Sequence, residues 1–341
     1  MNLFETMAKM GHEQVVYCHD PAVGYHGIIA IHSTMLGPAV GGTRFWNYAS
    51  EEEAVMDVLR LSRGMTYKTA VAGLNLGGGK AVIIGDSKTA DRKSIYRAHG
   101  RFIERLGGRF ITAEDVGTTM SDLEYVHLET KYAAGAKEDP SPWTAHGVFR
   151  GMQAAAKYRW GSDDLAGKTV ALQGCGQVGY CLAKELHEAG ATLIVSDVDA
   201  ERISRVVNEF GATAVGLEEI YSVSADIFAP CALGAVINDR TLPQLRVGIV
   251  AGAANNQLLE NRHGEALEAR NILYAPDYVI NAGGVISGSI ELLGFESAQA
   301  ISKVEGIYDT MLNIFEIART EEIPTYQAAD RLAERRLQLR Q

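Results

Sequence analysis

The sequence predicts a two-domain α/β protein, and three features support this prediction. Short apolar runs alternate with helix-like segments along most of the 341 residues, which is the pattern of sheets covered by helices. A glycine-rich turn at residues 174–179 joins an apolar run to a helix-like segment, as in the first unit of a nucleotide-binding sheet. A polar stretch with two prolines, at residues 133–142, marks a domain boundary. We therefore expect one domain over residues 1–138 and a second over residues 139–324.

The composition excludes several other classes of protein. A hydrophobic fraction of 47% and a charged fraction of 22% are typical of a globular protein, and no apolar run reaches the length of a membrane span. The formal net charge of −10 argues against a nucleic-acid-binding surface. The N-terminus lacks a basic region followed by an apolar core, so we expect no secretory signal and a cytoplasmic location. The four cysteines form no C-x-x-C pair, and we expect free thiols and no metal site.

The N-terminal segment predicts a pair of strands followed by a loop. Apolar runs at residues 14–18 and 25–32 flank a short turn and are typical of paired strands. Residues 36–44, L-G-P-A-V-G-G-T-R, are so rich in glycine that we expect a loop there. Gly41 and Gly42 would let the backbone approach a small molecule, although an ordinary surface loop explains the same residues equally well.

Two lysines stand out in the next part of the chain. Ser50 and the three glutamates after it predict the start of a helix that runs towards Arg63. Lys68 and Lys80 follow in apolar or glycine-rich sequence, which is unusual for solvated charges. Two lysines brought together in a desolvated site are easier to deprotonate, so one can bind a carboxylate while the other acts as a base. The alternative is that one lysine forms an ion pair and the other lies at the rim of a loop.

An acidic pair follows the next predicted strand. Within residues 108–119, a short apolar run ends at Glu114 and Asp115 before a glycine turn. Open α/β sheets bind ligands at the C-terminal ends of their strands, so these acids are candidates for a site. The structural alternative is that they cap a helix beginning at Ser121. Beyond the polar boundary, a helix from about Thr144 leads into the glycine-rich turn.

The glycine-rich turn predicts a Rossmann-type dinucleotide-binding domain. An apolar run over residues 169–172 enters the turn, a helix-like segment follows, and a second apolar run ends at Asp197. In this G-x-G-x-x-G spacing, Gly174 permits the tight turn, Gly176 lets the backbone approach a pyrophosphate, and Gly179 lets the helix pack against the strand. Asp197 is placed to accept hydrogen bonds from a ribose and would repel a 2′-phosphate, which favours NAD over NADP. The expected cofactor contacts in this unit are Gly174, Cys175, Gly176, Gln177, Val178, Gly179 and Asp197.

The alternation of strands and helices continues towards the C-terminus. Residues 225–233 and 247–254 predict strands that end in small residues, and shorter apolar runs follow at 272–275 and 279–280. Small residues and amides at successive strand ends describe the rim of a sheet, where a nicotinamide ring and a substrate would meet. Residues 298–319 predict one long amphipathic helix, and the basic tail after them is also helical.

Motifs spread over nearly the whole chain resemble those of the leucine/phenylalanine/valine dehydrogenases, a branch of the glutamate dehydrogenase superfamily. They are L-G-P-A-V-G-G-T-R, G-M-T-Y-K, G-L-N-L-G-G-G-K, I-T-A-E-D-V-G-T, D-I-F-A-P-C-A-L-G and A-P-D-Y-V-I-N-A-G-G-V. Within this branch the chain is most similar in type to leucine dehydrogenase. The resemblance implies an N-terminal α/β catalytic domain, a C-terminal NAD-binding domain, a cleft between them and a homo-oligomer. It also implies that the last helix, residues 325–341, returns to the first domain.

The resemblance also implies roles for individual residues. Lys68 matches the lysine that binds the amino-acid carboxylate, and Lys80 matches the general base that activates a water molecule. Asp115 matches the acid that relays protons to and from the amino group. Further substrate contacts are expected at Val40, Gly41, Asn256, Val285 and Gly288, and further cofactor contacts at Thr144, Ala232 and Asn255.

The activity implied by the resemblance is the reversible NAD-dependent deamination of an apolar L-amino acid, with leucine and other branched-chain substrates favoured. The products would be the 2-oxo acid, ammonia and NADH. Ser287 and Gly288 stand where leucine-type enzymes carry an amide and a valine, and Trp143 stands where a small residue is usual. An aromatic substrate, phenylalanine or tryptophan, is therefore the alternative. A catalytically silent protein that senses NADH is a second alternative, which the retention of both lysines and the acid disfavours.

Overall fold

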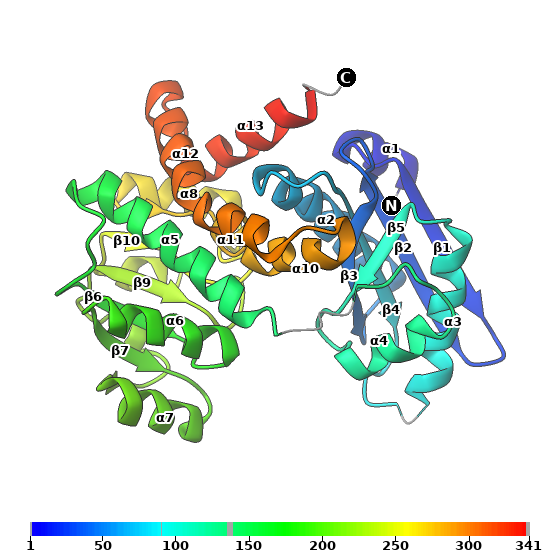
Figure 1. Cartoon of the computed structure of the whole chain (residues 1–341), viewed down its shortest axis with the longest axis horizontal. Helices are drawn as coiled ribbons and strands as arrows, with labels where there is room; N and C mark the ends of the chain where they lie inside the picture. Colours follow the sequence, from blue (N-terminus) through cyan, green and yellow to red (C-terminus); the bar gives the residue numbers. More distant parts are fainter. Residues whose placement is uncertain (1, 90, 135–138, 339–341) are drawn as a thin grey trace. The chain divides into compact units, whose positions relative to one another are not determined.

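The computed structural model divides into two compact units by its internal contacts (Figure 1). It describes residues 2–89, 91–134 and 139–338. The first unit comprises residues 1–138, 291–293 and 333–341, and the second comprises residues 139–290 and 294–332. Each unit contains one sheet with helices, which confirms the predicted α/β class. Among the described residues, none of the helices combines the length and the apolar character that a bilayer-spanning segment needs.

The first unit is built on a five-stranded sheet in the order β1-β2-β4-β3-β5. The strands are β1 (Gln14–Asp20), β2 (Tyr25–Ser33), β3 (Ala39–Trp46), β4 (Gly77–Ile84) and β5 (Phe110–Ala113). β2 pairs antiparallel with both β1 and β4, whereas β3 runs parallel to β4 and β5. The predicted pair of strands near the N-terminus is confirmed as β1 and β2.

Helices cover both faces of this sheet. They are α1 (Leu3–Met10), α2 (Glu51–Val71), α3 (Arg92–Arg105) and α4 (Met120–His127). Val58 and Leu59 of α2 pack with Ile28 and Val82 on one face. Apolar residues of α3 and α4 cover the opposite face, where Phe45 is buried. Because both faces are removed from water, β2 is buried along almost its whole length instead of alternating between buried and exposed residues.

α2 begins as predicted but ends later. The Ser50 hydroxyl accepts a hydrogen bond from a first-turn amide at 3.1 Å, which caps the helix. The sequence predicts an end near Arg63, but the helix continues to Val71. The additional turns are stabilised by packing, since Thr66 is fully buried. Lys68 therefore lies in the last turn of a helix.

The predicted loop over residues 36–44 is wrong, because most of this segment forms β3. Its glycines allow close packing and do not form a turn. A Cβ on Gly41 would lie 1.8 Å from the carbonyl oxygen of Gly79 in β4, and one on Gly78 would lie 2.0 Å from the amide nitrogen of Thr66. Glycine lets the two strands and α2 approach one another, so a stretch with the local character of a loop is stable within the sheet.

The second unit contains a six-stranded sheet in the order β11-β10-β9-β6-β7-β8. The strands are β6 (Thr169–Gln173), β7 (Thr192–Ser196), β8 (Thr213–Ala214), β9 (Ile227–Pro230), β10 (Ile249–Val250) and β11 (Leu273–Tyr274). Each neighbouring pair is parallel, and the chain reverses its direction of growth at β6. This is the strand order of a doubly wound Rossmann sheet, whose ligands bind at the reversal. The predicted Rossmann-type fold is confirmed.

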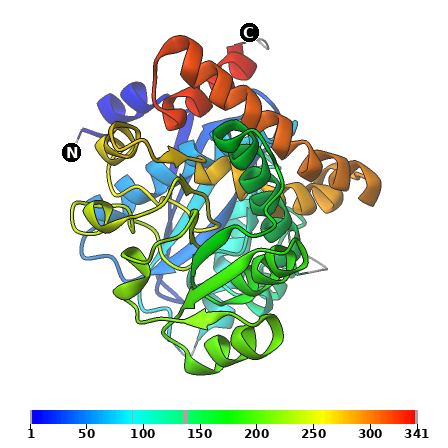
Figure 2. The ribbon, with the colours of Figure 1, turned by 90° about the vertical axis from the view of Figure 1, so that its left-hand side faces the viewer.

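Helices and loops lie on both sides of this second sheet, as Figure 2 shows with the green and the yellow segments. The helices from residue 141 onwards are α5 (Ser141–Trp160), α6 (Gln177–Glu188), α7 (Ala200–Phe210), α8 (Asn261–Ala269), α9 (Asp277–Ile280), α10 (Gly283–Leu293), α11 (Ser297–Glu305), α12 (Ile307–Glu321) and α13 (Thr325–Gln338). The long helix predicted over residues 298–319 is two helices, α11 and α12, which meet at Gly306, a residue of low helix propensity. Residues 279–280 lie in α9 and not in a strand.

The end of α13 contributes to the first unit. The Glu334 carboxylate accepts a hydrogen bond from the Tyr67 hydroxyl at 3.1 Å. Arg336 donates to the Ala70 carbonyl at 2.6 Å, near the C-terminal end of α2. Residues 339–341, which the predicted tail helix includes, lie outside the described residues.

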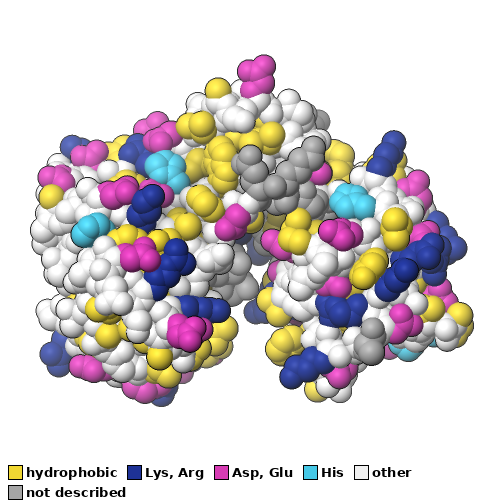
Figure 3. Space-filling view, turned by 60° about the horizontal axis from the view of Figure 1, so that its bottom comes forward, with side chains coloured by type: hydrophobic (Ala, Val, Ile, Leu, Met, Phe, Trp, Pro, Cys, Tyr) yellow, Lys and Arg dark blue, Asp and Glu magenta, His cyan; other side chains and the backbone are white. Residues whose placement is uncertain are grey.

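Charges of both signs are mixed on the surface. On the face shown in Figure 3, Lys and Arg side chains are interspersed with Asp and Glu in both units. Several such charges are paired, for example Arg101 with Asp20 at 3.0 Å. This mixed surface differs from the continuous basic stripe that binds nucleic acid.

Candidate active site

A buried ion pair joins strand β4 to the segment after β5. Lys80 is 6% exposed, and its Nζ lies 3.1 Å from Oδ1 of Asp115. Side chains alternate along β4, which places Lys80 on the side of the sheet that α2 covers. The residues predicted as base and proton relay are therefore in direct contact. Asp115 does not cap α4, because Thr119 and Asp122 form the capping box of that helix.

The surroundings shift the pKa of both groups. Burial lowers the pKa of Lys80; the carboxylate of Asp115 opposes this shift, and the guanidinium of Arg44 reinforces it. Burial raises the pKa of Asp115, but the charges of Lys80 and Arg44 outweigh burial and hold that pKa below its usual value. Asp115 is thus an anion beside a lysine that gives up its proton more readily than in water. A lysine whose pKa is lowered can act as a general base more readily than one in water.

Three further residues, Arg44, Asp57 and Tyr48, complete this network, and the sequence gives little sign of them. Nε of Arg44 lies 2.9 Å from Oδ2 of Asp115, and Nη1 of the same side chain lies 2.9 Å from Oδ2 of Asp57. The Tyr48 hydroxyl donates to the same Asp57 oxygen at 2.7 Å. Arg44 ends the glycine-rich motif of β3 and Asp57 lies on α2, so only the fold brings them together. The available signal is a single arginine directly after the run of small residues in β3.

A solvent-accessible pocket of about 550 Å³ opens beside this network. It is lined by Arg44, Trp46, Tyr48, Glu53, Met56, Asp57, Arg60 and Val116. Trp46 and Val116 are about half exposed and form part of its apolar wall. Arg44 therefore both lines this pocket and contacts the buried ion pair.

The predicted substrate residues of the first unit lie where α2 meets the sheet. Lys68 is half-buried in the last turn of α2, one turn after Met65. Met65 Cγ is 3.4 Å from the position of a Cβ on Gly41, and residues three apart share a helix face. Val40, beside Gly41, is buried. Lys68 and Gly41 thus belong to one region of the unit.

In the second unit, the glycine-rich turn has the form that a pyrophosphate needs. Gly174 has a φ of +99°, and a Cβ there would lie 2.9 Å from the Cβ of Ala232. A Cβ on Gly179 would lie 2.0 Å from the carbonyl oxygen of Gly174, whereas the space around Gly176 is open apart from Arg202 at 3.8 Å. Gly176 is the N-cap of α6 and makes no side-chain cap, so the first-turn amides of Gln177, Val178 and Gly179 have no acceptor within the helix. A helix start of this kind can bind an anion.

Asp197 lies beside this turn, immediately after β7. Its Oδ2 accepts a hydrogen bond from the Cys175 amide at 2.6 Å, and its Oδ1 accepts one from the Asp199 amide at 2.9 Å. These bonds fix the carboxylate next to the turn. Each carboxylate oxygen retains a second acceptor site, which a ribose hydroxyl can occupy.

The segments after β9 and β10 are tied together. The Ala235 amide donates to the Asn256 carbonyl at 2.7 Å, and both residues have positive φ angles, of 58° and 54°. The Asn281 side-chain amide donates to Oδ1 of Asn255 at 2.7 Å and to the Ala253 carbonyl at 3.0 Å. Asn281 therefore orients a predicted cofactor contact, a role that its place in the N-A-G-G-V motif signals only weakly.

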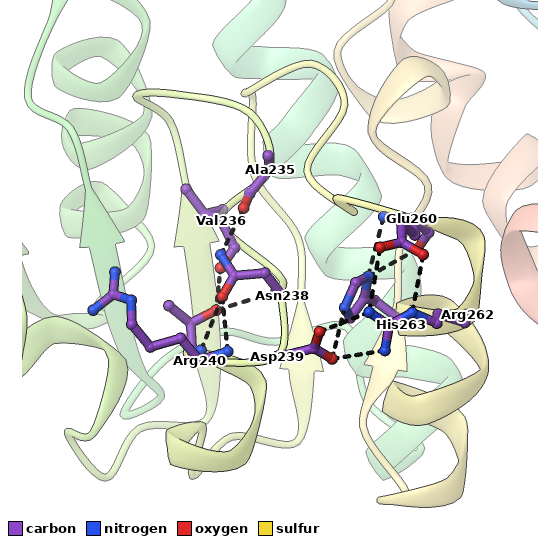
Figure 4. Close-up of polar contacts among 9 residues, drawn as sticks. Ala235, Val236, Asn238, Asp239, Arg240, Glu260, Arg262 and His263 are labelled. Carbon is purple, nitrogen blue, oxygen red and sulfur yellow. Dashed lines mark hydrogen bonds and ion pairs between the residues drawn. The ribbon is translucent and has the colours of Figure 1, made fainter.

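A polar cluster holds the loop after β9 against the start of α8 (Figure 4). Arg262 pairs with Asp239 through two contacts, at 2.6 and 2.7 Å, and its Nε lies 3.0 Å from Glu260. His263 Nε2 lies 3.3 Å from Asp239. The Asn238 side chain donates to the Ala235 carbonyl at 2.8 Å. The cluster thus fixes the loop that contains Ala235, whose amide donates to the Asn256 carbonyl. This loop lies at the rim of the sheet where the sequence predicts the nicotinamide.

The predicted residues on α5 and α10 lie close to one another. A Cβ on Gly284 would lie 2.8 Å from Oγ1 of Thr144, and Thr144 itself donates to the Pro140 carbonyl at 3.1 Å. Val285 is half-buried one residue further along α10. A Cβ on Gly288 would meet no atom within 4 Å. The missing side chain at Gly288 therefore leaves space, and the backbone has not closed over it.

The cysteines are not paired in disulfides. All four are free thiols, and burial raises the pKa of Cys175 and of Cys231 to about 12, so both are protonated. Within the described ranges, no group of three or more His, Cys, Asp or Glu side chains is placed to hold a metal ion.

Two family models match this chain. The model of the Glu/Leu/Phe/Val dehydrogenase dimerisation domain matches residues 12–132. The model of the glutamate/leucine/phenylalanine/valine dehydrogenases matches residues 135–203 and 196–330. Together they cover nearly all of both units.

Individual proteins show the same similarity. A leucine dehydrogenase from Thermoactinomyces intermedius is 57% identical over 99% of this chain and 94% of its own length. The crystal structure of an L-tryptophan dehydrogenase from Nostoc punctiforme superposes with a TM-score of 0.90, at 50% identity and 99% coverage of both chains. A hetero-hexameric glutamate dehydrogenase from Thermus thermophilus has a TM-score of 0.79 at 18% identity, over 99% of this chain and 96% of that one, which shows a common fold.

Proposed function

The chain belongs to the Glu/Leu/Phe/Val dehydrogenase family, and from this we propose that it is an NAD-dependent enzyme that reversibly deaminates an apolar L-amino acid, with leucine and other branched-chain substrates preferred. Family membership makes it an amino-acid dehydrogenase. The observation that supports the chemistry is the buried pair of Lys80 and Asp115, in contact at 3.1 Å. The products are the 2-oxo acid, ammonia and NADH.

The residues of the glycine-rich turn fit NAD. Side chains at Gly174 and Gly179 would overlap neighbouring backbone atoms, so only glycine allows the tight turn at these positions. This turn brings the start of α6 to the place where a pyrophosphate binds in such domains. The fixed carboxylate of Asp197 suits a ribose and disfavours a 2′-phosphate. When bound, NAD accepts the hydride from the substrate Cα.

The chain's own residues perform the remaining steps. Lys68 binds the substrate carboxylate, which orients the Cα. Neutral Lys80 removes a proton from the water molecule that adds to the substrate imine. Asp115 then transfers protons to and from the substrate nitrogen, so that the carbinolamine releases ammonia. The lowered pKa of Lys80 and the anionic Asp115 suit these two roles.

The preference for leucine rests on the relatives. Leucine dehydrogenases from Thermoactinomyces intermedius and Geobacillus stearothermophilus are 57% and 56% identical to this chain, against 51% for an L-tryptophan dehydrogenase from Nostoc punctiforme. The open space at Gly288 favours the second candidate, an aromatic amino-acid dehydrogenase, because a larger side chain needs such space. A silent NADH sensor is the least favoured candidate, because it has no need of the Lys80–Asp115 pair.

We also propose that the enzyme is a cytoplasmic homo-oligomer. The support for assembly is the matched model, which describes a dimerisation domain over residues 12–132. The glutamate dehydrogenase of the same fold from Thermus thermophilus is a hetero-hexamer.

Kinetics with a panel of amino acids and a Lys80→Ala variant test the proposed function. Leucine should give a higher kcat/KM than phenylalanine or tryptophan with NAD. Lys80→Ala should lower kcat by roughly 10²- to 10⁴-fold, the scale of a lost general base, while NADH binding measured by fluorescence is retained. Near-normal turnover by that variant would contradict the mechanism.

A further inference from the structure

We propose that Arg44, anchored by Asp57, is a positioning residue that fixes the orientation of the Asp115 carboxylate and supplies the positive charge beside Lys80. This inference rests on the proposed function, because it assigns a purpose to the partners of the two catalytic groups. It does not place Arg44 in contact with substrate.

The two oxygens of Asp115 have different partners. Oδ1 lies 3.1 Å from Lys80 Nζ, and Oδ2 lies 2.9 Å from Arg44 Nε. Rotation of the carboxylate would break the contact with Arg44, whose guanidinium is planar and directional. Arg44 therefore keeps Oδ1 turned towards Lys80.

Arg44 is itself held in place at its other end. Its Nη1 lies 2.9 Å from Asp57 Oδ2, which also accepts the Tyr48 hydroxyl at 2.7 Å. The side chains of Arg44 and Asp57 are only 22% and 13% exposed, so both are shielded from competing water. A guanidinium that bridges two carboxylates has little freedom to move away from Asp115.

A buried chain of hydrogen bonds fixes the strands that carry these groups. The Thr43 hydroxyl, next to Arg44 in β3, lies 2.6 Å from the hydroxyl of Thr112 in β5 and 2.7 Å from His99 Nε2. The His99 Nδ1 lies 2.7 Å from the Tyr25 hydroxyl. Burial lowers the pKa of His99 to about 3, so the imidazole in this series of hydrogen bonds stays neutral across the working pH range. The separation of Arg44 from the residues after β5 is therefore set by the sheet.

The charges around Lys80 come from three elements. Arg44 is on β3, Asp57 is on α2 and Asp115 follows β5, while β2 places Ala30 opposite Lys80. α2 also carries Lys68, which is unchanged in the variants compared below. Removal of the Arg44 charge leaves two carboxylates near Lys80, so protonated Lys80 becomes more stable. Removal of the Asp57 charge has the opposite sign, because that carboxylate favours protonated Lys80.

The pH dependence of kcat/KM for deamination by the full-length enzyme distinguishes this role from a merely structural one. The acid limb of this pH profile reports the protonation of Lys80. Arg44→Met should move that limb to higher pH by roughly one pH unit, which is the lower end of the effect of a neighbouring charge, and Asp57→Asn should move it to lower pH. Both variants should lose about 10-fold in kcat with little change in KM or in NADH binding. Arg44→Lys keeps the charge but not the planar fork, so it should retain the parental limb with a reduced kcat.

Arg60→Met is the matched control. Arg60 also contacts Asp57, at 3.4 Å, but its side chain is 62% exposed and makes no contact with Asp115. Its pH profile should equal that of the parent. If Arg44→Met does not fold, two other variants still test the inference. Arg44→Lys should leave the acid limb unmoved, and Asp57→Asn should shift it to lower pH.

Several outcomes would overturn the inference. They are an unmoved acid limb in Arg44→Met, shifts of the same direction in Arg44→Met and Asp57→Asn, or a shift in Arg60→Met as large as that in Arg44→Met. Lys80→Ala, measured in parallel, separates the two levels of the proposal. If Lys80→Ala is inactive while Arg44→Met keeps the parental profile, the inference alone fails. If Lys80→Ala retains turnover, the proposed role of Lys80 as the base fails together with the inference.

Discussion

Replacing His146 should reduce the stability of the second unit in acid but not in base. His146 on α5 lies between two carboxylates, with Nδ1 2.8 Å from Glu185 on α6 and Nε2 2.7 Å from Glu305 on α11. The hydrogen bond to Glu185, opposed by burial and assisted by Glu305, raises the pKa of His146 to about 9. The His146 imidazolium thus joins α5, which carries Thr144, to α6, which follows the glycine-rich turn.

The sign and size of the effect follow from this pKa. A raised folded-state pKa contributes stability fully below the unfolded pKa, about 6.5, and the contribution is lost as the pH rises through about 9. A difference of about 2.5 units corresponds to roughly 3 kcal/mol before screening. Because His146 is 35% and Glu305 45% exposed, solvent screening reduces the contribution to about 1 kcal/mol.

Urea unfolding of the parent and of His146→Gln, at pH 6 and at pH 10, measures this contribution. The difference in unfolding free energy should be about 1 kcal/mol at pH 6 and near zero at pH 10. Arg150→Gln is the control, because Arg150 lies 2.9 Å from Glu305 and keeps its charge over this range. Its effect should be the same at both pH values. Equal losses for His146→Gln at both pH values would refute the assignment of the raised pKa.

Three further predictions concern ligand binding. Lys68→Ala should raise KM for the amino acid, with a loss of roughly 2–5 kcal/mol in kcat/KM and unchanged NADH binding; an unchanged KM would contradict its role in carboxylate binding. Asp197→Ser should increase the use of NADP relative to NAD, because the repulsion is removed and Arg202 is near the turn. Equal use of both cofactors by the parent would show that Asp197 does not discriminate. Gly288→Val fills open space, so it should raise the leucine-to-phenylalanine ratio of kcat/KM by about 10-fold. A parent that prefers phenylalanine, and a variant that does not, would favour the aromatic candidate.

The parts of the molecule that depend on local sequence could be predicted. The glycine-rich turn is a local feature, because the sterics of Gly174 and the first turn of α6 are set by adjacent residues. The start of α2 could be predicted for the same reason, since Ser50 caps it through a bond within one turn. The Rossmann-type fold could be predicted from the alternation of strands and helices around that turn, although the strand order itself was not predicted.

The parts that depend on packing between distant segments could not be predicted. The glycines of β3 are compatible with a loop, and only their contact with Gly79 of β4 explains why they form a strand. The late end of α2 depends likewise on the contact of Thr66 with Gly78. Arg44 and Asp57 are 13 positions apart and belong to different elements, so no periodicity connects them. Their link to Asp115 appears only when β3 and β5 are adjacent in the sheet.

The contrast between tightly packed and open glycines bears on how such enzymes diverge. At Gly41, Gly78 and Gly283 even a methyl group would overlap backbone atoms, at 1.8, 2.0 and 1.9 Å. A substitution at any of these positions must displace the backbone, so it should destabilise the fold whatever its effect on activity. Gly288 has no such restriction, because no atom lies within 4 Å of the position of its Cβ. Of these four glycines, Gly288 is therefore the position where a larger side chain can be introduced without displacing the backbone, so we expect α10 to tolerate changes that the packed strands do not.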